Sequence, residues 1–276
     1  MSEISGADMV FSRVIAAVDA SGLDAIALHR VLDLASRLDV EAGALFIEDA
    51  NLFRLAGLPM VRHLTLGAQT TSPFTAERLE GELRDLASRV ASKLETAATR
   101  RGIRWSFRVV RGLPSVEVTA ATMNRDLVVV GCGRNVYGMP LRLQLPLSSA
   151  VLRAGRSILL AGQRTRLTRP LAVVCDGSPS RALAAAARFS EPGSELTALI
   201  VGVPSETSEA AAPAESPLLA RSYRSRQIKT LTQAELIRAI REGGHDLLVL
   251  PANVAWPVAS LENLMSEASC DVLVVQ

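Results

Sequence analysis

An internal repeat constrains the fold of this chain more than any other feature of its sequence. Residues 15–21 form an apolar run that ends in a polar, turn-prone segment, and residues 171–178 repeat this form. Further along, an aspartate followed by four apolar residues occurs at 126–130 and again at 246–250. Both patterns recur in the same order, so we expect two copies of one domain rather than one large domain.

The two copies differ in length. Asp19 and Asp176, which follow the first apolar run of each copy, are 157 residues apart (176 − 19). Asp126 and Asp246 are only 120 residues apart (246 − 126). The second copy is therefore 37 residues shorter (157 − 120) between its first and fourth strands.

The chain length agrees with two domains, because 276 residues exceed the ~150 residues of an average domain. We place the first domain at residues 1–162 and the shortened second domain at residues 170–276, joined by the polar, basic linker 163–169. Where the first copy has its longest helix, the second has residues 203–217, rich in Ser, Glu, Ala and Pro, which predict a flexible loop.

Within the first copy, short apolar runs alternate with segments of helical periodicity. Residues 24–39 and 75–101 carry apolar side chains at helical spacing, and Thr75 is the expected N-cap of the longer helix. Segment 50–74 is expected to be loop apart from a short helix at 52–56. This alternation predicts an α/β fold with a parallel, doubly wound sheet. The expected strands are 13–18, 41–47, 105–110, 126–131 and 157–160.

Composition excludes several classes of protein. Lys and Arg exceed Asp and Glu by only two (30 − 28), which gives no reason to expect a nucleic-acid partner. No apolar run approaches the ~20 residues of a membrane helix, and residues 1–8 lack the features of a signal peptide. We therefore expect a cytoplasmic protein without a membrane partner. The widely spaced cysteines and histidines argue against a disulfide framework or a metal site.

Several of these segments resemble the universal stress protein (UspA) family in its tandem form. They are the first-strand ends 18–21 and 175–178, the strand–Gly–x–Pro–helix junction 109–114, the strand 126–131 and the helical residues 151–153. The resemblance covers the first copy almost end to end and the second copy only at its two ends. It implies Rossmann-like domains of five strands, with the binding edge at the carboxyl ends of the strands.

The resemblance also implies how the two copies associate. In this family the last strand of one unit pairs with that of another. Residues 157–160 are thus expected to pair with residues 271–275, covering two otherwise exposed sheet edges. The result would be an intramolecular pseudo-dimer with pseudo-twofold symmetry, and further association into a homodimer is left open.

ATP-binding members of the family carry Gly-x-x-Gly, nine further residues, and then Gly-Ser or Gly-Thr. Glycines allow successive backbone N–H groups to surround phosphates, and the following helix N-terminus adds a positive dipole. In this chain Gly131 fits the first glycine, Arg134 stands in place of the second, and Leu145-Pro146 replace the final pair. Proline has no N–H to donate to a phosphate. One of the three glycine positions is therefore kept.

The kept residues define one candidate nucleotide site, in the first copy. Asp19 would contact the ribose, a phosphate or a metal of a nucleotide, with a helix-capping turn as its structural alternative. Ser148 and Ser149 would cap a helix and meet an anion. No glycine follows Leu250, so we expect no triphosphate in the second copy. The candidate nucleotide-binding residues are Asp19, Ala20, Ser21, Gly131, Gly133, Arg134, Ser148 and Ser149.

These observations predict a non-enzymatic regulatory or stress-response protein. The expected ligand is an adenine nucleotide, ATP or AMP, without a metal. The first alternative is a ligand-free protein-interaction scaffold, for which the apolar residues of segment 50–74 could dock a protein partner, although they could equally cover a cavity or complete the core. The second is a nucleotide-hydrolysing enzyme, which needs a base and an intact phosphate cradle, and the sequence shows neither.

Overall fold

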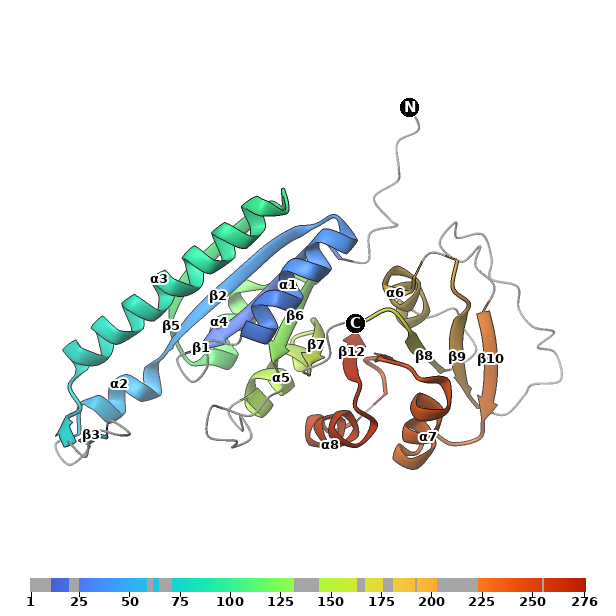
Figure 1. Ribbon diagram of the computed structural model, residues 1–276. Coiled ribbons are helices and arrows are strands. Elements are labelled where there is room, and N and C mark those ends of the chain that lie inside the picture. The colour runs from blue at the N-terminus through green and yellow to red at the C-terminus, as the bar shows by residue number, and fades with distance from the viewer. Residues whose placement is uncertain are drawn as a thin grey trace.

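The computed structural model describes residues 11–19, 25–58, 62–64, 71–131, 144–162, 167–175, 181–191, 193–202, 223–254 and 256–276. Ten strands form one continuous sheet (Figure 1). From the first copy come β1 (Arg13–Asp19), β2 (Glu41–Asp49), β5 (Trp105–Gly112), β6 (Asp126–Gly131) and β7 (Ser157–Ala161). From the second come β8 (Pro170–Cys175), β9 (Leu196–Val201), β10 (Tyr223–Ile228), β11 (Leu247–Pro251) and β12 (Asp271–Val275).

Both halves of the sheet have the same topology. The order across the sheet is β10-β9-β8-β11-β12-β7-β6-β1-β2-β5. Numbered within its own copy, each half therefore reads third, second, first, fourth, fifth. Neighbouring strands are parallel within each half. The expected parallel, doubly wound α/β architecture is confirmed in both halves.

The two halves meet at their last strands. β7 and β12 pair antiparallel, with Leu159 opposite Leu273. An antiparallel junction between two parallel halves of equal strand order relates them by a pseudo-twofold axis. The predicted pairing of residues 157–160 with 271–275 is thus confirmed, and it covers one edge of each half.

Helices cover both faces of the sheet, and the strand residues alternate between two apolar cores. On one face lie α1 (Ala25–Leu38), α2 (Ala50–Ala56), α3 (Ala76–Arg100) and α6 (Arg181–Phe189). On the other lie α4 (Pro114–Ala121), α5 (Gln144–Arg153), α7 (Gln233–Gly243) and α8 (Val258–Ala268), as Figure 1 shows for α5, α7 and α8. In β1, Val14 and Ala16 point to the first core and Ile15 to the second, as a period of two requires.

The long helix α3 follows from its sequence. The Thr75 side chain accepts a hydrogen bond from the backbone N–H of Arg78 at 3.3 Å, which caps the first turn. Gly102, with a φ of +65°, follows the C-cap Arg101, in a conformation that favours glycine. The buried stripe at helical spacing is Leu79, Leu83, Ala87, Val90, Leu94 and Ala98.

Segment 50–74 differs in part from its prediction. The short helix is present as α2, but a small antiparallel pair, β3 (Arg62–Leu64) with β4 (Thr71–Pro73), lies where only loop was expected. Strands of three residues are too short to show an alternating pattern, which explains why the sequence did not reveal them.

The shortening of the second copy lies where it was predicted. Asp49, at the end of β2, and Trp105, at the start of β5, are 56 positions apart (105 − 49). Val201 and Tyr223, the corresponding ends of β9 and β10, are 22 positions apart (223 − 201). The interval that holds α2 and α3 in the first copy is thus 34 positions shorter in the second (56 − 22).

Helix α1 ties the two copies together through two arginines. Arg30 donates to the Asp271 carboxylate at 2.9 Å, and both side chains are almost fully buried. Arg37, two turns further along, donates to the carbonyl oxygens of Leu167 at 2.9 Å and of Phe189 at 2.7 Å. The first copy therefore contacts the second through side chains of α1 as well as through the β7–β12 ladder.

Candidate functional site

The topology of the first copy predicts a crevice between the carboxyl ends of β1 and β6. These strands are parallel neighbours, paired from Arg13 with Asp126 to Ala16 with Val129. From β1 the chain goes through α1 to β2 on one side, whereas β6 continues to β7 on the other. Such a switch in direction opens a binding crevice in doubly wound sheets. Asp19 and Gly131 are the last residues of these two strands, so the fold brings both to this edge.

The structure describes only part of the predicted site. Gly131 is buried at the end of β6, and of Asp19 only the backbone is described. The remaining loop positions of the prediction lie outside the described residues. They are Ala20, Ser21, Gly133 and Arg134.

The expected role of the two serines as helix caps is wrong. Helix α5 begins at Gln144, so Ser148 and Ser149 lie in its second turn and cannot cap it. The helix can begin this early because Pro146 falls in the first turn, where backbone N–H groups have no intrahelical partner. Ser148 is fully buried, and its Oγ has no hydrogen-bond partner among the described residues.

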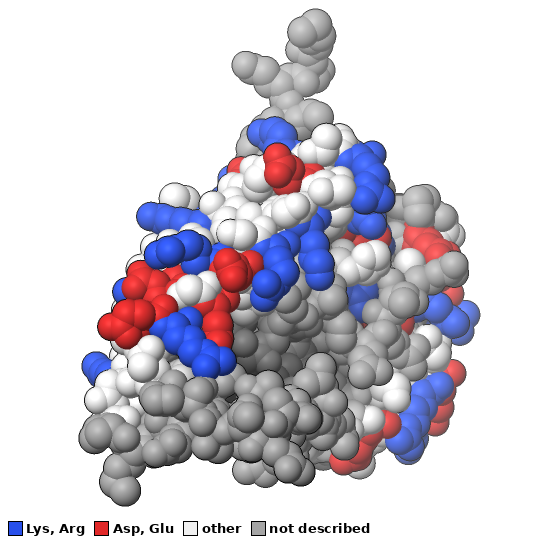
Figure 2. All heavy atoms as spheres, turned by 60° about the vertical axis from the view of Figure 1, so that its left-hand side comes forward, with Lys and Arg blue, Asp and Glu red and all other residues white. Residues whose placement is uncertain are grey.

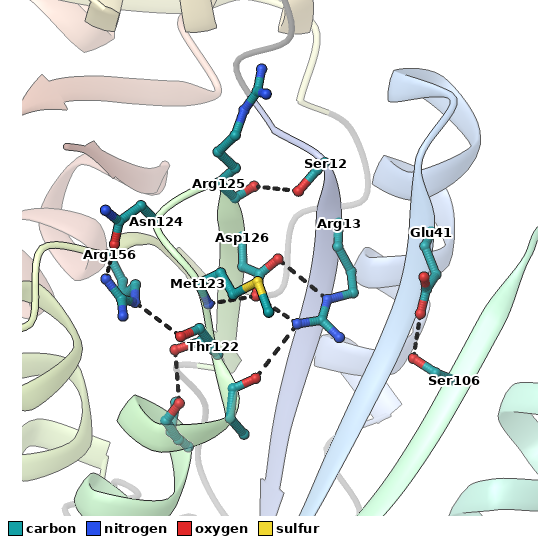
Figure 3. A network of polar contacts seen from close by, with 12 residues as sticks. Ser12, Arg13, Glu41, Ser106, Thr122, Met123, Asn124, Arg125, Asp126 and Arg156 are labelled. Carbon is teal, nitrogen blue, oxygen red and sulfur yellow. Dashed lines mark hydrogen bonds and ion pairs between the residues drawn. The ribbon is translucent and has the colours of Figure 1, made fainter. Parts of the chain in front are cut away.

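A polar network holds the opposite edge of the first copy (Figure 3). The Asp126 carboxylate accepts hydrogen bonds from Arg13 at 2.7 and 3.2 Å and from the backbone N–H of Met123 at 2.8 Å. The hydrogen bond with Asp126 raises the pKa of Arg13. Beside it, the Ser106 hydroxyl donates to Glu41 at 2.5 Å. These groups fix the amino ends of the strands and stand apart from the crevice.

Two carboxylates at the end of β2 are engaged in structural contacts. Glu48 accepts from Arg111 at 2.7 Å, and the guanidinium of Arg111 also stacks over the Phe53 ring at 4.2 Å. The hydrogen bond with Glu48 raises the pKa of Arg111. Asp49 instead caps α2 by accepting from the Asn51 N–H at 2.9 Å. The Arg111 cluster was not predicted, because Glu48 and Arg111 meet only through the pairing of β2 with β5.

Charge on the face that includes α3 is mixed. Figure 2 shows Lys and Arg side chains interspersed with Asp and Glu, without a broad field of one sign. Opposite charges alternate along α3 itself, where Arg78 pairs with Glu82 at 2.9 Å. The described residues of this face therefore form no basic stripe of the kind typical of nucleic-acid interfaces.

The second copy carries different residues at its corresponding crevice. Its strand register places Pro170 opposite Leu247, whereas Val14 lies opposite Leu127 in the first copy. The offset between the first strands is therefore 156 (170 − 14), not the 157 inferred from the aspartates. Cys175 takes the place of Asp19 (175 − 19 = 156), and Asp176 lies one position later, outside the described residues.

The same register identifies the counterpart of Gly131. Adding 120 residues, the spacing of Asp126 and Asp246, leads to Pro251 at the end of β11. Proline offers no N–H and fills space that glycine leaves open. At these two strand-end positions the second copy thus has a thiol where the first has a carboxylate, and a proline without an N–H where the first has a glycine.

Among the residues that the structure describes, no group of three or more His, Cys, Asp or Glu side chains could hold a metal ion. Within the same residues, no helix has the length and apolar character required to span a bilayer.

Comparison with known proteins gives matches only at the level of structure. The sequence matches no protein-family model and no curated protein. The structure is similar to that of a universal stress protein from Archaeoglobus fulgidus DSM 4304, with a TM-score of 0.64, 14% identity and 97% of each chain covered. It is also similar to a candidate universal stress protein from Pseudomonas aeruginosa UCBPP-PA14, with a TM-score of 0.55, 16% identity and coverage of 97% of this chain and 94% of that one.

A functionally unknown protein from Pseudomonas aeruginosa PAO1 is a further structural match, with a TM-score of 0.52 and 17% identity. The alignment covers 97% of this chain and 93% of that protein. Because these matches extend over nearly the whole chain, they include both copies. The chain has the tandem universal stress protein fold.

Proposed function

We propose that this protein is a regulatory protein of the universal stress protein type, which binds an adenine nucleotide in its first copy and catalyses no reaction. One observation carries the proposal. Asp19 and Gly131 end two adjacent strands at the switch point of the first copy, where the second copy has Cys175 and Pro251. A carboxylate can accept from ribose hydroxyls, and a glycine lets the backbone approach a phosphate closely.

Further support comes from α5. The buried Oγ of Ser148 has no hydrogen-bond partner among the described residues, and buried hydroxyls are rarely left unpaired in folded proteins. Helix α5 follows the β6 strand end and the loop that contains the rest of the predicted site. A polar ligand bound near this loop would supply a hydrogen-bond partner for the Ser148 Oγ.

The proposed chemistry is binding without turnover. Glu48 and Asp49 are the last two residues of β2. Glu48 pairs with Arg111, and Asp49 caps the N-terminus of α2. A general base must be able to reach the proton that it abstracts. Neither carboxylate is arranged for that role among the described residues.

The test is calorimetric titration of the full chain with ATP and with AMP, after analysis of nucleotide released from the purified protein. We expect one site per chain. Asp19→Cys, which installs the residue of the second copy, should weaken binding at least about tenfold by removing a charge-assisted contact. The matched control Cys175→Ala should leave affinity unchanged, and thermal unfolding verifies that both variants fold.

The outcomes separate the alternatives. A stoichiometry near zero for both nucleotides contradicts nucleotide binding and leaves the interaction scaffold. If the protein releases phosphate from ATP and the Asp19→Ala variant does not, this result contradicts the proposed absence of catalysis.

The scaffold alternative has an observation of its own. Apolar side chains at the carboxyl edge of the first copy are exposed to solvent, including Leu55 and Leu58 near α2 and Leu113 and Val116 near α4. Exposed apolar groups of this kind occur at protein interfaces. Leu52 and Phe53, by contrast, pack against the core.

A further inference from the structure

A groove of about 620 Å³ opens in the second copy, at the edge of the sheet opposite to the crevice. Its floor is made by Leu171, Thr197 and Leu199 of β8 and β9, and α7 forms one wall with Ala239 and Glu242. Small-molecule sites have volumes of roughly 300–1,000 Å³, with apolar walls and a few polar groups. The groove has both the size and the mixed lining of such a site.

Two arginines of β10 line the groove. Arg224 and Arg226 are two residues apart on a strand, so their side chains point to the same face of the sheet, which Ile228 identifies as the α7 face. Arg224 pairs with Glu195 at 3.3 Å, and Arg226 pairs with Glu242 at 2.8 Å. Their side chains are 75% and 45% exposed, and exposed ion pairs of this kind contribute little to stability.

The end of the groove adds a third arginine and a histidine. Arg169 donates to the Gly243 carbonyl oxygen at 2.8 Å, and the Nδ1 atom of His245 lies 3.2 Å from the Arg169 carbonyl oxygen. Burial lowers the pKa of His245, so its ring is neutral near pH 7. The groove therefore contains three arginines, two glutamates and a neutral imidazole, with one net positive charge (3 − 2).

The first copy does not repeat this arrangement. Leu196 pairs with Tyr223 as Ala42 pairs with Trp105, so Arg224 corresponds to Ser106 and Arg226 to Arg108. Ser106 donates to Glu41, and one member of the arginine pair is replaced by a short neutral side chain. Of the two copies, only the second has an arginine at both of these positions.

We propose that this groove binds a small organic anion whose carboxylate or phosphate group lies between Arg224 and Arg226 and whose apolar part rests on Leu171 and Leu199. Guanidinium groups bind both kinds of anion through paired N–H donors, and each arginine can exchange its exposed glutamate for the ligand. This site differs from the proposed nucleotide site in both copy and sheet edge, so each can exist without the other.

The test uses the full chain and four probes that share a phenyl ring: benzoate, phenyl phosphate, benzyl alcohol and benzylamine. Titrations followed by amide NMR should show saturable binding of at least one anion, with the largest shifts at Leu171, Thr197 and Arg226. The neutral alcohol and the cationic amine should not saturate the site. Binding of benzoate alone identifies a carboxylate ligand, and binding of phenyl phosphate alone identifies a phosphate ester.

Substitutions of single arginines identify the side chains that contact the anion. Arg224→Gln and Arg226→Gln should each weaken anion binding at least about tenfold, because each removes a charge-assisted pair. Arg238→Gln is the matched control, since Arg238 lies 4.0 Å from Glu242 on the same helix but does not line the groove. Its affinity should equal that of the unmodified protein. Asp19→Cys should also leave probe binding unchanged.

Four results would overturn the proposal. They are no saturable binding of either anion, equal binding of benzylamine, unchanged affinity in both arginine variants, or the same loss in Arg238→Gln. A fifth overturning result is loss of probe binding in Asp19→Cys, which would place the anion at the first copy instead. Because these results do not depend on ATP titration, failure of this proposal and failure of the nucleotide proposal are distinguishable.

Discussion

The two copies share a strand order but differ at the ends of their strands. At the carboxyl edge, the first copy has Asp19 and Gly131, where the second has Cys175 and Pro251. At the amino edge, the second has Arg224 where the first has Ser106. The apolar strand interiors specify the repeated fold, whereas the strand ends are free to acquire or lose binding groups. A repeat in sequence is therefore good evidence for a repeated fold and poor evidence for a repeated site.

The largest effect is expected from breaking the contact that joins the copies. Asp271→Ala leaves Arg30 buried without its carboxylate and removes the acceptor of the Gly162 N–H. Removing one partner of a buried ion pair costs about 3–5 kcal/mol. Urea unfolding followed by circular dichroism measures the loss. The double variant Arg30→Met/Asp271→Leu should recover most of it, and a loss below about 1 kcal/mol in Asp271→Ala would contradict the assignment.

The two matching aspartates provide the next comparison. Asp246 accepts from two backbone N–H groups, those of Thr168 and Arg169, at 2.8–3.1 Å. Asp126 accepts from only one backbone N–H, that of Met123, and otherwise from Arg13, whose side chain is 27% exposed and can turn to solvent. Asp246→Ala should therefore cost about 2–3 kcal/mol and Asp126→Ala about 1–2 kcal/mol. Equal losses, measured by the same unfolding experiment, would show that the two aspartates have equivalent roles.

A smaller effect concerns α3, which has no counterpart among the described residues of the second copy. Gly102→Ala should destabilise the protein by about 1 kcal/mol, because the positive φ strains an alanine. Gly81→Ala is the control within the same helix. An added Cβ there meets nothing within 4 Å, so alanine should stabilise the helix by about 0.5–1 kcal/mol. Shifts in melting temperature of the same sign in both variants would contradict this explanation.

The smallest effect is a pH dependence specific to the second copy. Burial, and to a lesser extent the charge of Arg169, lower the folded-state pKa of His245, while the hydrogen bond with the Arg169 backbone and the charge of Asp246 act in the opposite direction. Above the ordinary histidine pKa of about 6.5, neither folded nor unfolded protein binds the proton. As the pH falls below that value, the unfolded chain binds a proton that the folded protein resists, so stability decreases.

His245→Asn should flatten this decrease, because asparagine does not titrate. The free energy of unfolding is measured from about pH 7 to pH 5. His29→Asn, at an exposed position of α1 in the first copy, is the control. An unchanged slope in His245→Asn would rule out His245 as the source.

The sequence predicted those parts of the fold that depend on local apolar pattern. β6, β7 and β12 are continuous apolar runs, and α3 has both an apolar stripe and a capping threonine. No element was predicted at β10. Its residues Arg224 to Gln227 are polar, because an edge strand exposed to solvent needs no apolar alternation.

The candidate site was harder to predict for a different reason. The aspartates Asp19 and Asp176 look equivalent because each precedes a small residue and a serine. Only the ladder shows that Cys175 is the true counterpart of Asp19, since register depends on hydrogen bonds between distant strands. The groove under α7 depends in the same way on how a helix packs on the sheet, which no local pattern contains.

The contacts of α1 with the second copy affect how fragments of this chain behave. A polypeptide that stops after the first copy would keep Arg30 without Asp271, and β7 would present an uncovered edge. Open edges of this kind recruit strands from other molecules. The two halves therefore do not form independent modules, and a fragment expressed alone should aggregate or capture another copy of itself.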